Sequence, residues 1–137
     1  MKPAEDTAAP TLMSTLKRFE SAHGRGSVEE MRACFHDEAL IESVASAGHQ
    51  LGPDETAEAL QAALQDGLYL IADWRYEEIS PGVVLSWTAA RHRSARGGVS
   101  HETVYRLTVG RDGLMWRVSL FPSRAEALAE LERVGTS

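Results

Sequence analysis

Several polar residues near the carboxyl-terminal end alternate in a way that could serve acid–base chemistry. His101, Thr103 and Tyr105 occupy every second position of one stretch, and Arg117 and Ser119 do so in the next. A histidine titrates near neutral pH and can carry a proton. A tyrosine hydroxyl and an arginine guanidinium can polarise an oxygen of a ligand. We therefore take His101, Tyr105 and Arg117 as the candidate catalytic residues.

Arg117 has two interpretations that the sequence leaves open. A buried arginine cannot lose its proton, so it must find acceptors. In one interpretation Arg117 pairs with a carboxylate of the protein, for example Asp73 or Glu102, and is structural. In the other it holds a carboxylate or enolate of a ligand.

The remaining reactive residue types do not form a recognisable site. The five histidines are scattered and Cys34 is the only cysteine, so we expect no metal. We also expect no cofactor. Asp37 and Glu38 are expected in a turn between a helix and a strand. The basic stretch 91–96 is interpreted as a solvated hairpin tip, with a phosphate or coenzyme contact as the alternative.

Length and composition indicate one ordinary globular domain. The chain has 137 residues and a formal net charge of −6, which suits a single core and argues against general nucleic-acid binding. No apolar run approaches the ~20 residues that a membrane span needs, so we expect no membrane partner. One cysteine excludes an intrachain disulfide and fits a reducing compartment such as the cytoplasm. We expect a disordered lead over residues 1–10 and one domain over 11–135.

Helix signals dominate the first half of the sequence. A first helix is expected from a cap at Thr11 to an end at Gly24 and Gly26. Ser27 and Glu30 form an S-x-x-E capping box, which predicts a second, short helix directly after the first. The elements that follow are a strand over 39–45, a short return strand over 49–51 and a third helix from Gly52 to Gly67.

From residue 68 onward the apolar residues recur at every second position, which predicts strands. The expected strands cover 68–78, 83–93, 99–109 and 114–121, and a closing helix covers 125–134. Long hairpins of this kind form a curved antiparallel sheet. We therefore predict a cone-shaped α+β fold, with three helices from the first half of the chain on one face of the sheet and a short carboxyl-terminal helix. The space between helices and sheet is a common place for a pocket.

Three stretches resemble a known group of proteins. They are GSVEEMRACFHDEALIE, the start of the third helix at Gly52, and the ending DGLMWRVSLFPSRAEALAEL. Together they resemble the SnoaL-like domain of the nuclear-transport-factor-2-like superfamily, over about Leu12 to Val134. That group includes polyketide cyclases, ketosteroid isomerases and limonene epoxide hydrolases. The resemblance implies a cystatin-like α+β cone with a ligand-binding pocket.

The positions that the isomerases use for catalysis carry other residues here. Their oxyanion-binding tyrosine falls on Phe19, their general-base aspartate on Ser43 and their protonated aspartate on Thr103. Phe19 has no hydroxyl and Ser43 is no base near neutral pH, so we expect no ketosteroid isomerase activity. The epoxide hydrolases need two aspartates bridged by an arginine, whereas here Arg117 is followed by Val118.

The resemblance turns the face that carries Arg117 toward the helices and implies a mostly apolar pocket with a few polar groups. The expected ligand contacts are Phe19, Ile41, Ser43, Trp87, Thr103, Ser119 and Phe121. One hypothesis is a small-molecule-binding protein, with an isomerase, cyclase or hydrolase reaction on a hydrophobic polyketide- or steroid-like ligand. The other is a non-catalytic binding or interaction module that lacks the family's carboxylates. Whether the chain is an enzyme stays open.

The last strand also predicts an oligomer. Its apolar residues Leu114, Trp116, Val118 and Leu120 are expected on the face away from the helices, where a monomer would expose them. We therefore expect a homodimer that forms through the outer face of the sheet.

Overall fold

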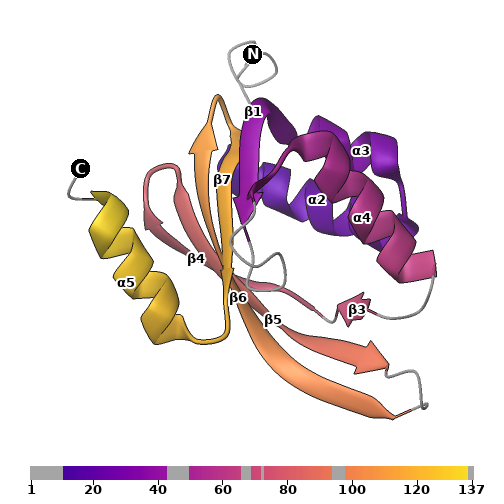
Figure 1. Cartoon of the computed structure of the whole chain (residues 1–137). Helices are drawn as coiled ribbons and strands as arrows, with labels where there is room; N and C mark the ends of the chain where they lie inside the picture. The colour runs from indigo at the N-terminus through magenta and orange to yellow at the C-terminus, as the bar shows by residue number, and fades with distance from the viewer. Residues whose placement is uncertain (1–10, 43–49, 66–68, 72, 94–97, 136–137) are drawn as a thin grey trace, which may run out of the picture.

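The computed structural model describes residues 11–42, 50–65, 69–71, 73–93 and 98–135. The expected disordered lead, the Ser43 contact and most of the basic hairpin tip lie outside these ranges. Within them the chain folds as four helices and one sheet (Figure 1). The elements in chain order are α2 (Leu12–Arg25), α3 (Val28–Ala33), β1 (Phe35–Glu42), β2 (Gln50–Leu51), α4 (Pro53–Gln65), β3 (Tyr69–Ile71), β4 (Arg75–Ser80), β5 (Val83–Arg93), β6 (Val99–Arg111), β7 (Leu114–Phe121) and α5 (Arg124–Gly135).

One mixed sheet joins all the described strands. They lie in the order β2-β1-β7-β6-β5-β3, and β4 also pairs with β5. β1 runs parallel to β7, whereas the other pairs are antiparallel. The predicted α+β fold is confirmed, but the sheet is not wholly antiparallel, because β1 lies beside the last strand and runs in the same direction. None of the described helices is long and apolar enough to cross a membrane.

α2 begins and ends where the sequence predicts. The Thr11 side chain accepts a hydrogen bond from the Ser14 backbone N–H at 3.1 Å and caps the helix. Gly26 ends the helix with a φ of 67°, the left-handed conformation that favours glycine. Leu16 and Phe19 are buried, so one face of α2 packs on the core.

The two glycines at the end of α2 should respond oppositely to alanine. A Cβ at either Gly24 or Gly26 would meet no heavy atom within 4 Å. Gly26→Ala is expected to cost about 1–2 kcal/mol, because alanine resists the left-handed conformation. Gly24→Ala is expected to stabilise the fold by about 0.5–1 kcal/mol, because Gly24 lies inside the helix. Urea denaturation of both variants measures the difference, and equal effects would contradict this description of the helix end.

β1 starts at Phe35, earlier than the predicted start at residue 39. The turn predicted at Asp37 and Glu38 is therefore wrong, because both residues lie within the strand. Phe35 and Ala39 are buried in the core, which fixes this part of the chain as a strand. The single strand predicted over 68–78 is likewise replaced by β3 and β4, which pair with different parts of β5.

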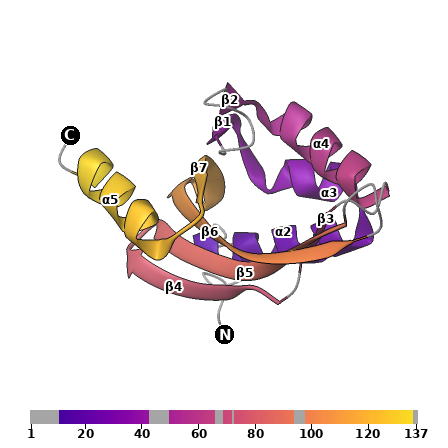
Figure 2. The same ribbon diagram turned by 60° about the horizontal axis from the view of Figure 1, so that its bottom comes forward.

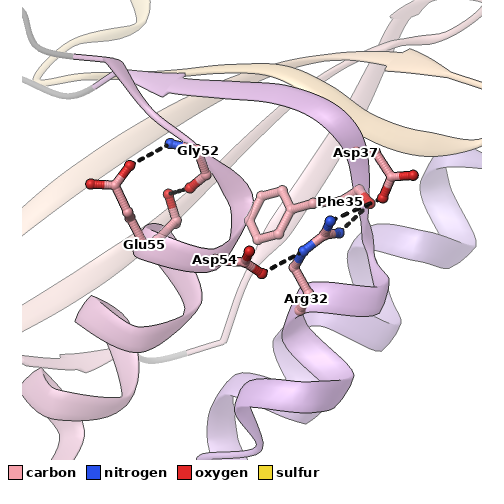
Figure 3. A network of polar contacts seen from close by, with 7 residues as sticks. Arg32, Phe35, Asp37, Gly52, Asp54 and Glu55 are labelled. Carbon is pink, nitrogen blue, oxygen red and sulfur yellow. Dashed lines mark hydrogen bonds and ion pairs between the residues drawn. The ribbon is translucent and has the colours of Figure 1, made fainter.

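Arg32 connects α3, β1 and the start of α4 (Figure 3). Its guanidinium lies 2.9 Å from the Asp37 carboxylate and 2.8 Å from the Asp54 carboxylate. It also donates a hydrogen bond to the carbonyl oxygen of Phe35 at 3.3 Å. Exposed ion pairs contribute little stability one at a time. We therefore interpret this network as a device that orients three elements, and not as a functional site.

Both faces of the long strands are buried. Ser86 and Arg106 pair across β5 and β6 and point toward α2. Leu85 and Leu107 point the other way, yet they are only 0% and 4% exposed. α5 contacts β6 and β7, and its Ala127 is fully buried. The carboxyl-terminal helix therefore covers the second face, and β7 lies between α5 and α4 (Figure 1, Figure 2).

β7 contains a bulge at Trp116, where its register with β6 shifts by one residue. Beyond the bulge Val118 is 4% exposed and belongs to the core that α2 covers. The predicted outward row of Leu114, Trp116, Val118 and Leu120 is therefore wrong, because strict alternation does not continue across a bulge. Arg117 lies on the face away from α2. The homodimer itself stays a prediction.

Candidate functional site

The sheet separates residues that were expected to line one pocket. Phe19 and Ile41 are buried on the α2 side. The residues on the side that faces α5 are Trp87, Thr103, Tyr105, Arg117, Ser119 and Phe121. Ser43 and the side chain of His101 lie outside the described residues. The expected set therefore does not share one face, and its contacts with a ligand stay predictions.

Along β5 and β6, alternate side chains form two rows on opposite faces of the sheet. The row that faces α2 is offset by one residue from the row that was expected there. Such a shift moves every side chain of a strand to the other face. Leu85 and Trp87 belong to the more apolar row, which agrees with the expectation that Trp87 would face the helices as a ligand contact. The row that faces α2 carries Ser86, Thr88 and Arg106 instead. On the side of α5, Leu85 is buried, whereas Trp87 is partly exposed.

Arg117 contacts no carboxylate within the described residues. Its guanidinium donates to the carbonyl oxygens of Glu38 at 3.1 Å and of Trp116 at 3.2 Å, and it stacks 3.9 Å from the centre of the Trp116 ring. Of the expected partners, Asp73 is exposed, and the side chain of Glu102 lies outside the described residues. Arg117 is thus a half-buried residue of the α5 side.

Arg106 is the arginine that the described part of the fold buries. Its side chain is 4% exposed and reaches Glu20 on α2. Nη1 and Nη2 donate to the two carboxylate oxygens of Glu20 at 3.0 and 2.9 Å, which is a bidentate pair. Nε donates to the Ser86 hydroxyl at 3.2 Å. The rule that a buried arginine must meet acceptors applies here to Arg106 rather than to Arg117.

Tyr76 on β4 bonds the same carboxylate. Its hydroxyl donates to Glu20 Oε2 at 2.6 Å, so Glu20 accepts from a phenol as well as from a guanidinium. Burial, together with this hydrogen bond and the charge of Glu20, raises the pKa of Tyr76 well above its ordinary value. We call Glu20, Tyr76, Ser86 and Arg106 the polar cluster.

The raised pKa of Tyr76 predicts a loss of stability in alkali. The phenol stays protonated in the fold but ionises in the unfolded chain above about pH 10. The contribution of the raised pKa is therefore complete below that pH and decreases as the pH rises further. Denaturant unfolding between about pH 8 and pH 11 should show a steeper decline for the wild type than for Tyr76→Phe, which lacks the ionising group. Parallel declines would contradict the raised pKa.

Two aromatic rings flank the guanidinium of Arg106. Its Cζ lies 3.9 Å from the centre of the Trp74 ring and 5.9 Å from the centre of the Phe19 ring. Such contacts add a cation–π attraction. Phe19 is 5% exposed, whereas Trp74 is partly exposed. The polar cluster therefore lies between apolar walls, an arrangement common in ligand sites.

His23 lies one helical turn beyond Phe19, with the two ring centres 6.0 Å apart. It is 4% exposed, and its Nε2 has no hydrogen-bond partner within the described residues. Burial lowers the pKa of His23; the charge of Glu20 opposes this shift, and the charge of Arg106 adds to it. The imidazole is therefore neutral at neutral pH.

Helix spacing and strand register bring these groups together. Glu20 and His23 are three residues apart on α2 and share a face of the helix. Tyr76, Ser86 and Arg106 are cross-strand neighbours on β4, β5 and β6. A charged residue of an amphipathic helix is ordinarily expected on the solvated face, so the residue type of Glu20 alone does not indicate a buried role. The signal that could have found the cluster is a glutamate beside the apolar stripe together with an arginine inside a predicted strand.

A pocket of about 140 Å³ opens between α2 and α3. It is lined by Arg18, Ser21, Arg25, Glu30, Ala33 and Cys34. Arg25 already donates to Ser21 and Glu30, and burial raises the pKa of the Cys34 thiol, so the thiol stays protonated at neutral pH. These properties do not favour a ligand site. Nor does any group of three potential metal ligands come together within the described ranges.

Known proteins resemble this chain in structure and not detectably in sequence. No family model matches the sequence, and no curated protein matches it. A nuclear-transport-factor-2-like protein of unknown function from Burkholderia pseudomallei superposes with a TM-score of 0.63 at 14% identity, over 86% of this chain and 95% of that chain. The chain has the nuclear-transport-factor-2-like fold.

Two further solved structures are similar to this chain in fold. A candidate polyketide cyclase from Pseudomonas putida superposes with a TM-score of 0.67 at 12% identity, over 84% of this chain and 93% of that chain. TerC, which was co-crystallised with polyporic acid, superposes with a TM-score of 0.70 at 14% identity, over 89% of this chain and 98% of that chain. At these identities the likeness shows the fold, which confirms the fold that the sequence predicts.

Proposed function

We propose that this chain is a cytoplasmic small-molecule-binding protein whose ligand lies between α2 and the sheet, against the polar cluster. The observation that carries the proposal is the bidentate Glu20–Arg106 pair beside aromatic rings, in which the side chain of Arg106 is 4% exposed and that of Glu20 is 15% exposed. A buried ion pair is a weak source of stability compared with apolar packing of the same volume. A role in recognising a polar group of a ligand accounts for it better.

The surroundings of the pair favour a ligand with a hydrophobic skeleton and few oxygens. Phe19 and Trp74 offer apolar surface, and the bonds named above use three of the five N–H groups of Arg106. A polyketide- or steroid-like molecule has this character. The similarity in fold to TerC and to a candidate polyketide cyclase supports the same class of ligand. Isomerase, cyclase or hydrolase chemistry on it would need a proton carrier, and His23 is the candidate on this face.

Two half-buried tryptophans on opposite faces of the sheet allow a matched test. Trp74 lies on the α2 side over Arg106, whereas Trp87 lies on the α5 side, where it stacks on Tyr105 with ring centres 6.3 Å apart. A bound ligand raises the unfolding temperature by mass action. Thermal unfolding is measured for the wild type, Trp74→Leu and Trp87→Leu with a panel of naphthols, hydroxylated steroids and polyporic acid.

The panel should contain a compound that stabilises the wild type and Trp87→Leu but not Trp74→Leu. The reverse pattern would put the ligand on the α5 side, where the sequence-based prediction had most of its contacts. If no compound raises the unfolding temperature of the wild type, the proposed function is wrong.

The α5 side supports a second candidate, a homodimeric interaction module. Trp87, Tyr105 and Phe121 are partly exposed there, and the first two rings stack. A second copy of the chain could cover this apolar surface. The expected homodimer would then use these residues instead of the row predicted on β7. Sedimentation at micromolar concentration tests this candidate, and a monomer would remove it.

A further inference from the structure

We propose that His23 is a ligand-binding residue and that its Nε2 bonds a neutral hydroxyl group of the ligand. This inference deepens the proposed function and rests on it. His23 is 4% exposed, and its Nε2 has no hydrogen-bond partner within the described residues. Buried polar atoms of folded proteins are nearly always hydrogen-bonded. An unpartnered nitrogen beside the polar cluster is therefore where a polar atom of the ligand would bond.

The charged neighbours of His23 are already paired with each other. Glu20 accepts from Arg106 and from Tyr76, and Arg106 also donates to Ser86. The opposite charges of Glu20 and Arg106 compensate one another at contact distance. A ligand carboxylate would find no unpaired cation in the polar cluster and would be buried beside Glu20, which is costly. The cluster therefore favours a neutral polar group.

A hydroxyl fits His23 better than a carbonyl does. Because burial lowers the pKa of His23, the imidazole is neutral, with one nitrogen as donor and the other as acceptor. A hydroxyl both donates and accepts, so it satisfies Nε2 in either tautomer, whereas a carbonyl can only accept. The Phe19 ring, centred 6.0 Å from the imidazole, supplies an adjacent apolar wall. The ligand class is thus a phenol, enol or alcohol on a hydrophobic ring system.

Three naphthalenes that differ in one substituent test this assignment. Isothermal titration calorimetry measures 2-naphthol, 2-methoxynaphthalene and 2-naphthoic acid with the wild type, His23→Leu and His36→Leu. The wild type should bind 2-naphthol at least about tenfold more tightly than the ether or the acid. His23→Leu should lose this preference. His36→Leu should keep it, because His36 lies on β1 and accepts from the Glu38 backbone N–H instead.

The free protein gives a second readout. His23→Leu should unfold at a higher temperature than the wild type, because leucine removes a buried polar atom that has no partner. His36→Leu should give no such gain, since its imidazole is already hydrogen-bonded. A lower unfolding temperature for His23→Leu would indicate that the imidazole is needed by the fold itself and would overturn the assignment.

The outcomes separate this assignment from the proposed function. Equal affinities of the wild type for 2-naphthol and its methyl ether, or a preference that persists in His23→Leu, would overturn the assignment and leave the proposed function standing. If 2-naphthol does not bind to the wild type, the assignment of His23 is likewise overturned, and the proposed function still stands. Failure of the whole panel described above would overturn the proposed function and the assignment together.

Discussion

Arg106→Met is expected to destabilise the fold by about 3–5 kcal/mol, because it leaves Glu20 buried without its cation. Arg106 is 3% exposed and bridges β6 and α2, so water cannot readily replace the lost bonds. The Tyr76 hydroxyl would still donate to Glu20, but a single neutral donor does not compensate a buried carboxylate. Urea denaturation of the variant and the wild type measures the loss.

Arg117→Met is the matched control, since Arg117 lies on the neighbouring strand. It should cost less than about 1 kcal/mol, because within the described residues its guanidinium bonds only backbone carbonyls. Adding Glu20→Gln to Arg106→Met should recover part of the larger loss, since the substitution removes the unpaired charge. Similar losses for the two arginines, or no recovery in the double variant, would contradict the buried pair.

Leu85→Ala is expected to cost about 2–5 kcal/mol, as a large-to-small change in a packed core does. Leu85 is 0% exposed although it points away from α2, on the face where α5 contacts the neighbouring strand β6. The loss should match that of Leu16→Ala, a fully buried residue on the α2 side. Leu60→Ala, at a half-buried position of α4, should lose clearly less. Thermal or urea unfolding measures all three, and a loss at Leu85 close to zero would mean that α5 does not protect the second face.

Element boundaries could be predicted where the signals are local. The caps at Thr11 and Ser27 and the end of the first helix at Gly26 were identified from residue type and spacing, and the structure confirms them. β5 and β7 also begin and end at the predicted residues. Signals of this kind act within a few residues, so they can be read without knowing what the element packs against.

The orientation of the strands could not be predicted in the same way. Along β5 and β6 the row that faces α2 carries Ser86 and Arg106, while the apolar row with Leu85 is buried by a helix that comes much later in the chain. Alternation indicates two rows but does not say which one a distant helix covers. The bulge at Trp116 then exchanges the two faces along β7.

The candidate site could not be predicted, because its hydrogen bonds join residues that are distant in the sequence. Glu20 and Arg106 lie far apart in the sequence, and each alone has the features of a solvated charge. The physical rule that a buried arginine needs acceptors was applied to Arg117, which turns out to be half-buried. Phe19, an expected ligand contact, does lie on the face of α2 that packs on the core, and its contact with a ligand stays a prediction.

One measurement tests the central claim most directly, namely that a ligand binds on the α2 side of the sheet against the polar cluster. Intermolecular nuclear Overhauser effects are recorded between 2-naphthol and the aromatic protons of the wild-type protein. We predict contacts with the rings of Phe19, His23 and Trp74, and none with Trp87 or Tyr105. Contacts with Trp87 and Tyr105 alone would contradict the claim.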